Sequence, residues 1–246
     1  MSARAGIGFP PAPTIAGRLR RRAWREWYRW TSERRLRSWH DRVVRERVAG
    51  LDLEVWPGVF NPKRLRTGAV LASFLDGRAD LDGLDVLDLG TGSGVGALSA
   101  ARRGARVAAV DTNPLAVRCA RINASLNGLE SRTQIIAGDL FGPVGGRRFD
   151  RVVFNPPYWR EPPRSEYDRS FRSLDVLDRF AVALPAHLKP GGVAWVLVSS
   201  DGVGQDTLGR MTACGLTLGV LDTVDLGNEI VAILEVVPNR VEVATA

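Results

Sequence analysis

The sequence predicts an α/β fold in which seven mostly parallel strands form a Rossmann-like sheet, with helices on both faces and a helical arm at the N-terminus. From residue 86 onward, short apolar segments alternate with segments of helical character, and this alternation implies a parallel sheet covered on both sides. The last two apolar segments are separated only by residues 222–229. That connection is too short for a helical crossover, so the last strand should run antiparallel to the strand before it.

Each element follows from its apolar pattern. The expected strands are short runs of Val, Ile, Leu and Ala at residues 86–89, 106–110, 133–137, 151–154, 192–199, 216–221 and 230–236. The expected helices repeat apolar residues at helical spacing over residues 67–75, 97–103, 114–127, 176–184 and 207–214. Residues 51–60 read as an extended segment, and we expect one domain to span residues 51–246.

The chain before this domain divides into a tail and a basic arm. Residues 1–14 contain prolines and show no period, which predicts a flexible tail. The arm covers residues 15–50, where residues 18–49 hold twelve arginines against four acids, although the whole chain has a formal charge of only +7. Tryptophans recur among these arginines at about helical spacing, which predicts one or two amphipathic helices. The arm could pack on the domain, contact a protein acceptor, RNA or the ribosome, or, least favoured, dock on a membrane.

Composition excludes several classes of protein. No apolar run reaches transmembrane length, and the first residues lack the apolar centre of a secretory signal. We therefore expect a cytoplasmic protein. The two cysteines and two histidines do not cluster, so neither a disulfide framework nor a metal site is expected.

The end of the first parallel strand has the pattern of a nucleotide-cofactor site. Four residues of the following turn are candidates for cofactor binding: Gly90, Thr91, Gly92 and Gly94. Glycines allow a tight turn and let a ligand approach backbone N–H groups. Nicotinamide, flavin and sulfonium cofactors all use such turns. Asp111, at the end of the second strand, could accept both ribose hydroxyls of the cofactor, or it could cap the next helix.

Two further acids make the choice of cofactor narrower. Asp88 precedes the glycine turn by two positions, where it can face a cationic cofactor, whereas a dinucleotide fold usually keeps this strand apolar. Asp139 follows the third strand and could accept a hydrogen bond from an adenine amino group, or it could be a solvated loop acid. These positions favour a sulfonium cofactor over a nicotinamide.

The segment Asn155-Pro156-Pro157-Tyr158 follows the fourth strand. Together with the glycine turn and the three acids described above, it resembles the motifs of a known family. The chain resembles class I S-adenosylmethionine-dependent methyltransferases that act on planar nitrogens, in the small-domain group that has the Asn-Pro-Pro-Tyr motif. The resemblance implies S-adenosyl-L-methionine as cofactor and no metal. It also implies that Asn155, Pro156 and Tyr158 serve catalysis, with Asn155 next to the cofactor.

The Asn-Pro-Pro-Tyr segment suits this chemistry. A planar nitrogen delocalises its lone pair and is a poor nucleophile. The Asn155 side-chain oxygen and the Pro156 carbonyl could accept its two N–H groups and favour a pyramidal nitrogen, while the prolines hold both acceptors rigidly. Tyr158 would stack on the flat substrate. The alternative is a rigid turn that ends a strand.

Two subgroups of the family compete for the acceptor. The residues after the motif resemble the release-factor glutamine methyltransferases, which modify a protein amide. Residues 57–68 resemble the ribosomal RNA guanine-N2 methyltransferases, in which this element lies over the cofactor, and the loop at residues 160–173 should choose the substrate. We favour a protein glutamine amide. A nucleobase amine in RNA or DNA and a small molecule stay open.

Two other classes of protein have less support. A NAD-dependent oxidoreductase could use the same glycine turn, but Asp88 and the Asn-Pro-Pro-Tyr segment do not suit it. A non-catalytic RNA-binding module could keep the fold, but it would have no need of Asp111 and Asn155.

Overall fold

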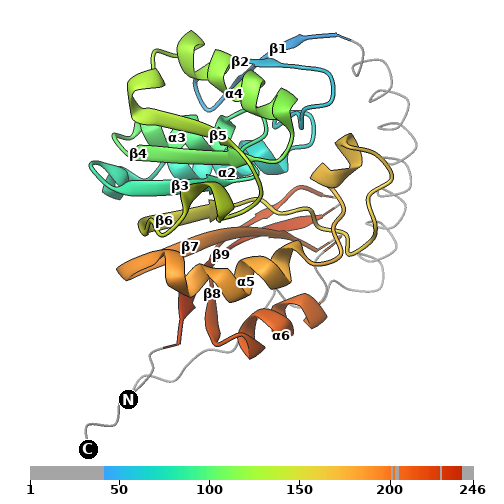
Figure 1. Ribbon diagram of the computed structural model, residues 1–246. Coiled ribbons are helices and arrows are strands. Elements are labelled where there is room, and N and C mark those ends of the chain that lie inside the picture. The colour runs from blue at the N-terminus through green and yellow to red at the C-terminus, as the bar shows by residue number, and fades with distance from the viewer. Residues whose placement is uncertain (1–41, 201, 203–204, 228, 240–246) are drawn as a thin grey trace, which may run out of the picture.

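The computed structural model describes residues 42–200, 202, 205–227 and 229–239, and it shows a three-layered α/β domain (Figure 1). A seven-stranded sheet has the order β5-β4-β3-β6-β7-β9-β8. Strands β3, β4, β5, β6 and β7 pair in parallel, and β9 runs antiparallel to both its neighbours, β7 and β8. The predicted seven-stranded, mostly parallel sheet with helices on both faces and an antiparallel last strand is therefore confirmed. Among the described helices, none is long and apolar enough to cross a membrane.

The elements lie close to their predicted positions. The strands of the large sheet are β3 (Asp85–Leu89), β4 (Arg106–Asp111), β5 (Thr133–Ala137), β6 (Phe149–Phe154), β7 (Leu188–Ser199), β8 (Leu216–Asp225) and β9 (Ile230–Pro238). The helices are α2 (Thr67–Asp76), α3 (Val95–Arg102), α4 (Pro114–Leu126), α5 (Val176–His187) and α6 (Gln205–Ala213). Short 3-10 turns, η1 (Ala79–Leu81), η2 (Glu130–Arg132), η3 (Gly142–Val144) and η4 (Tyr167–Ser170), lie in the connections.

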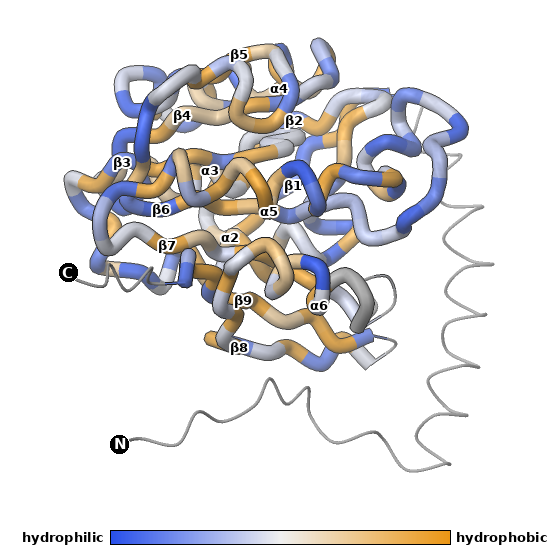
Figure 2. The backbone as a smooth tube through the Cα atoms, turned by 60° about the horizontal axis from the view of Figure 1, so that its bottom comes forward, coloured by the Kyte–Doolittle hydropathy of each residue, from blue (hydrophilic) through white to orange (hydrophobic). Residues whose placement is uncertain are grey.

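Alternation along the strands separates two hydrophobic cores. Val86 and Val107 face the side covered by α2, α3 and α4, whereas Leu87 and Ala108 face the side covered by α5 and α6. Apolar residues follow the central strands while the connecting loops are hydrophilic (Figure 2). Because the sheet is buried on both faces, its strands carry nearly continuous apolar runs, which is why they could be placed from the sequence.

The first described element corrects the prediction for the arm. Residues 44–48 were expected to end a helix, but Val44–Val48 is a strand, β1, that pairs antiparallel with β2 (Leu51–Val55). Ala49 and Gly50 connect them with φ values of 46° and 77°, as in tight hairpin turns. Val48 is buried in the core, so the hairpin belongs to the domain and the arm ends earlier than residue 50. Residues 1–41, which hold the predicted tail and most of the arm, lie outside the described residues.

Helix α4 fastens this hairpin to the domain through two asparagines one turn apart. Asn123 Oδ1 accepts the N–H of Glu54 at 2.8 Å, and its Nδ2 donates to the carbonyl of the same residue at 2.9 Å. Asn127 makes the same pair of bonds with Asp52, at 3.1 and 2.8 Å. The two amides thus act as a neighbouring strand on the edge of β2 that β1 leaves open, and they satisfy its backbone groups.

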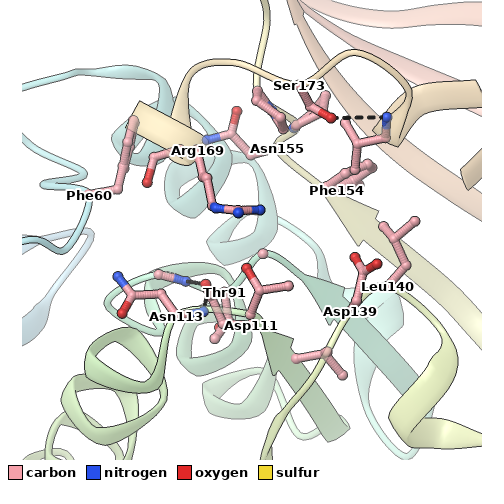
Figure 3. A pocket seen from close by; sticks show the side chains of 18 of the residues that line it. Phe60, Thr91, Asp111, Asn113, Asp139, Leu140, Phe154, Asn155, Arg169 and Ser173 are labelled. Atoms are coloured by element: carbon pink, nitrogen blue, oxygen red, sulfur yellow. Dashed lines mark hydrogen bonds between the residues drawn. The ribbon is translucent and has the colours of Figure 1, made fainter. Parts of the chain in front are cut away.

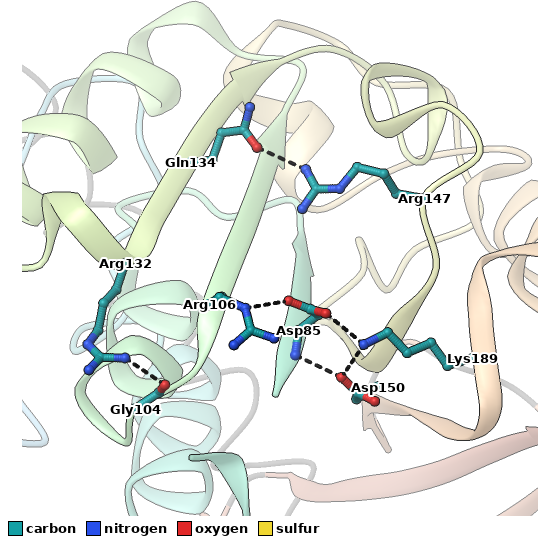
Figure 4. A network of polar contacts seen from close by, with 8 residues as sticks. All are labelled: Asp85, Gly104, Arg106, Arg132, Gln134, Arg147, Asp150 and Lys189. Carbon is teal, nitrogen blue, oxygen red and sulfur yellow. Dashed lines mark hydrogen bonds and ion pairs between the residues drawn. The ribbon is translucent and has the colours of Figure 1, made fainter. Parts of the chain in front are cut away.

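A polar network ties four parallel strands at their N-terminal ends (Figure 4). Asp85 of β3 bonds Arg106 of β4 at 2.9 Å and Lys189 of β7 at 2.6 Å. Lys189 also reaches Asp150 of β6 at 2.7 Å, and Asp150 accepts the N–H of Asp85 at 2.8 Å. The network lies at the strand ends opposite to those that carry the predicted site residues, which leaves the C-terminal edge of the sheet for a ligand.

Candidate active site

One cavity of about 460 Å³ opens at the C-terminal ends of the central strands. Its lining comes from the turn after β3, the end of β4, the loop after β5 and the segment after β6. Figure 3 shows Asp111 and Asn113 on one side of this cavity and Asn155 and Phe60 on the other, with the Arg169 side chain projecting between them. Parallel strands bring segments that are far apart in sequence to one edge, where α/β sheets bind ligands.

The glycine turn wraps this end of β3 as predicted. Gly90, Gly92 and Gly94 have φ values of 64°, 56° and 87°, which side chains with a Cβ rarely adopt. Gly90, Thr91 and Gly92 line the cavity, and α3 starts at Val95, directly after the turn. Bare backbone and a helix N-terminus therefore face the ligand space, an arrangement that favours a negatively charged or polar group of a ligand.

Asp111 ends β4 and is bound to the glycine turn. One carboxylate oxygen accepts the N–H of Gly92 at 2.8 Å, and the other accepts the N–H of Asn113 at 2.9 Å. Burial raises the pKa of Asp111, against the effect of these hydrogen bonds. The helix cap is Asn113, whose side chain accepts the N–H of Leu115. Asp111 is therefore not the cap of α4, and its remaining lone pairs are available to a ligand in the cavity that it lines.

Asp88 lies beneath the glycine turn. Its Oδ2 accepts the hydroxyl of Thr91 at 2.7 Å and the N–H of Ala97 at 2.9 Å. Burial raises its pKa to about 7, and the nearby charge of Asp111 adds to the shift. A Cβ on Gly96 would approach Asp88 Oδ2 to 3.0 Å, so the first turn of α3 needs glycine there. Asp88 lines the cavity while it also holds the turn in shape.

Asp139 follows β5 and is paired, although about half of its side chain stays exposed to solvent. It forms an ion pair with Arg179 of α5, and both residues line the cavity. The sequence did not indicate Arg179, because the partner comes from a helix forty positions away. A side chain about half exposed at this rim can exchange an arginine contact for a ligand contact.

The segment Asn155-Pro156-Pro157-Tyr158 forms the opposite wall of the cavity. It directly follows Phe154, the last residue of β6, and has no regular secondary structure. The Tyr158 hydroxyl donates to the side-chain oxygen of Asn155. All three residues predicted to serve catalysis therefore line the same cavity as Asp111 and the glycine turn.

The loop at residues 160–173, which was expected to choose the substrate, covers one end of the cavity. Its base is closed by backbone bonds between Trp159 and Phe171 at 2.9 Å and between Ser173 and Trp159 at 3.0 Å. Phe171 also packs on Phe60, with ring centroids 5.9 Å apart. Arg169 and Phe60 line the cavity. The sequence indicated the segments that hold them, residues 160–173 and 57–68, but not these two side chains, because contact across two loops leaves no local signal for a single residue.

Across the described part of the chain, no group of three or more His, Cys, Asp or Glu side chains is arranged to hold a metal ion.

This fold is shared with a solved AdoMet-bound methyltransferase, and with the glycine turn and the Asn-Pro-Pro-Tyr wall it defines the class that the sequence predicted, the S-adenosylmethionine-dependent methyltransferases. The chain belongs to the methyltransferase small domain family, whose profile matches residues 50–213.

Similar proteins fall into both subgroups that the sequence pointed to. The ribosomal RNA small subunit methyltransferase C of Alcanivorax borkumensis is 37% identical over 155 residues, which are 63% of this chain and 44% of that protein. A putative protein N5-glutamine methyltransferase of Methanocaldococcus jannaschii is 32% identical over 185 residues, which are 70% of this chain and 88% of that protein. The chain thus spans less than half of the first relative and most of the second.

A solved structure shares the fold. A 16S rRNA N2 methyltransferase from T. thermophilus, in complex with AdoMet and guanosine, has a TM-score of 0.62 and 25% sequence identity. The match covers 81% of this chain and 50% of that one.

Proposed function

We propose that this protein transfers a methyl group from S-adenosylmethionine to a planar nitrogen, and that its preferred acceptor is the side-chain amide of a glutamine in a protein. The observation that carries the proposal is a single cavity lined both by the cofactor residues, Asp111 and the glycine turn, and by Asn155. When bound, the cofactor supplies an activated methyl group. The protein supplies position and electrostatics.

The lining fits this cofactor chemically. Asp111 can accept the ribose hydroxyls, because its two carboxylate oxygens offer about four lone pairs and the backbone N–H groups of Gly92, Asn113 and Thr112 use only part of them. Asp139 can accept an adenine amino group at the rim. Asp88, at the base of the turn, lies where the negative charge of its ionised form would favour a cationic ligand.

The acceptor nitrogen would lie against Asn155. The Asn155 side-chain oxygen and the Pro156 carbonyl accept its two N–H groups, which localises the nitrogen lone pair and aims it toward the methyl group. Two consecutive prolines restrict the backbone of this segment, so both acceptors keep their positions through the reaction. Neither group needs to change its protonation state.

The charge of the 160–173 loop supports a protein acceptor. Its four arginines are all engaged with acids: Arg160 with Asp178, Arg164 with Glu161, Arg169 with Glu166, and Arg172 with Asp168. Nucleic-acid binding depends on arginines and lysines that neutralise phosphates. A loop whose arginines are already paired with acids, three of them in the loop and one in α5, is better suited to a protein segment.

A nucleobase amine is the second candidate. The solved relative that holds guanosine shares this fold, and residues 57–68 contribute Phe60 and Gly68 to the cavity, as the resemblance to the RNA enzymes implied. In that case the basic arm, which lies outside the described residues, would contact the phosphates. With a protein acceptor the arm would contact that protein or the ribosome, in the cytoplasm.

The deciding experiment uses methyl-labelled S-adenosylmethionine, the purified protein and a cell extract. Label that becomes soluble after protease treatment, and that mass spectrometry locates on a glutamine amide, supports the proposal. Label released by ribonuclease instead assigns the activity to an RNA base. Label that resists both treatments identifies DNA or a small molecule as acceptor, and no incorporation contradicts the transferase proposal.

Replacing the key acceptor should separate binding from chemistry. We expect Asn155→Ala to leave cofactor affinity unchanged within about twofold and to lower kcat at least about a hundredfold, as removal of one transition-state hydrogen-bonding group does elsewhere. Calorimetry with the cofactor and the labelling assay measure the two quantities. Undiminished turnover would remove Asn155 from the mechanism.

A further inference from the structure

The hydroxyl of Tyr158 has a partner that the stacking role does not require. It donates a hydrogen bond to the side-chain oxygen of Asn155, the same atom that should accept an N–H of the substrate. A phenylalanine would supply the same ring for stacking. The hydroxyl therefore needs its own explanation, which rests on the proposed function of Asn155.

The ring of Tyr158 is held in place from behind. It packs against the core between the sheet and α5 and α6, and Gly202 lies against the Cβ and the main chain of the same residue. A Cβ added at Gly202 would be 2.3 Å from the Cβ of Tyr158. Packing of the ring in this core, together with the close approach of Gly202 to its Cβ and main chain, sets the direction of the hydroxyl.

The surroundings of the hydroxyl keep it a donor. Burial raises the pKa of Tyr158 by more than a hydrogen bond with Thr67 lowers it, and the negative charge of Glu229 adds to the rise. Glu229 itself is bonded by the hydroxyl of Ser199, and its carboxylate lies 3.6 Å from Arg66 Nη2. Tyr158 thus stays protonated at any working pH and keeps its proton for Asn155.

Asn155 needs such a donor because its last side-chain torsion is soft. The torsion that rotates an asparagine amide has broad, roughly two-fold preferences, and Asn155 is only partly buried. A half-turn of the amide would place its NH₂ group where the acceptor oxygen should be. A donor that binds one lone pair of the oxygen stabilises the productive orientation and leaves the second lone pair for the substrate.

We propose that Tyr158 is a positioning residue whose hydroxyl holds the Asn155 amide with its oxygen toward the acceptor nitrogen. Stacking of the ring and this role of the hydroxyl are separate. Loss of the hydroxyl alone should make the Asn155 side chain more mobile, while the aromatic ring at position 158 stays in place.

The first test does not depend on activity. In protein labelled with ¹⁵N-asparagine, the side-chain signals of Asn155 are identified by their absence in Asn155→Ala. We expect the order parameter of the Asn155 side-chain NH₂ group to be about 0.85 in the wild type and below about 0.6 in Tyr158→Phe. The matched control is Tyr167→Phe, which removes the hydroxyl of a tyrosine that packs on Phe171 in the loop. This variant should leave the order parameter of the Asn155 side chain as high as in the wild type. Equal rigidity of Asn155 in the wild type and in Tyr158→Phe would overturn the proposal.

The second test separates an action through Asn155 from a general loss of structure. In the methyl-transfer assay, Tyr158→Phe should lower kcat about tenfold, equivalent to the loss of one hydrogen bond, with cofactor affinity unchanged. In the Asn155→Ala background the same substitution should have no further effect. Equal losses in both backgrounds would contradict a role through Asn155. If the wild type transfers no methyl group, the proposed function fails. The order parameter of the ¹⁵N-labelled Asn155 side chain still decides whether Tyr158 positions Asn155.

Discussion

Asp88 lies where its protonation should control the binding of a cation. Its pKa of about 7, raised by burial, makes it neutral below that pH and charged above it. A positively charged cofactor should therefore bind more weakly as the pH falls, by about tenfold between about pH 8 and about pH 6. Calorimetry across this range measures the change, and Asp88→Asn should flatten it. Because the pKa of Asp111 is also raised, the difference between wild type and variant isolates the part due to Asp88.

Asp111 should contribute to cofactor binding through the charge of its carboxylate. Hydrogen bonds to a charged acceptor are worth about 1.5–3 kcal/mol, so Asp111→Ala should raise the Kd for S-adenosylmethionine about tenfold or more. The variant also removes the acceptor of the Gly92 N–H, which loosens the turn. Asp52→Asn, on the exposed side of β2, is the control and should not change the Kd. A Kd within about twofold of wild type for Asp111→Ala would assign the ribose to other residues.

At the scale of the elements, the hairpin and α4 form a unit that no local pattern indicates. Asn123 is buried and bonds β2 and the carbonyl of Ser93, while Asn127 makes more exposed bonds. We expect Asn123→Ala to lower the free energy of unfolding by about 2–3 kcal/mol, because it leaves buried groups of β2 without partners, and Asn127→Ala by about 1 kcal/mol. Urea unfolding measures both. Equal losses would contradict the role assigned to burial.

The elements also show where a sequence is misleading. Val44 and Val48 fit a helical spacing with the tryptophans before them, but residues four positions apart also share one face of a strand, and valine favours strands. Pairing with the edge of β2 decided in favour of the strand over the helix, and that edge exists only after folding.

The helix α2 begins at Thr67 without a side-chain cap, because Arg66 occupies the cap position with a φ of 62°.

At the scale of the whole molecule, the cofactor should contact several segments that are far apart in sequence and that the sheet brings to one edge. A ligand held by the ends of β3, β4 and β5 stabilises only the folded state, by about 2.7 kcal/mol at a concentration of 100 times its Kd. Thermal unfolding with S-adenosylmethionine should show this gain, and the same concentration of NAD should show none. Asp111→Ala at the same ligand concentration should gain less. Equal stabilisation by NAD would revive the oxidoreductase alternative.

The sequence by itself determined the sheet, its helices and the residues at each strand end. Buried strands are continuous apolar runs, and the glycine turn, Asp111 and the Asn-Pro-Pro-Tyr segment are local patterns. Only the tertiary structure decided the contacts made across the sheet edge. The pairing of Asp139 with Arg179, the contact of Phe60 with the loop and the bond from Tyr158 to Asn155 depend on side-chain packing. Such packing is specified by the folded surroundings of a residue, because the distances involved are set by the strand order and not by separation along the chain.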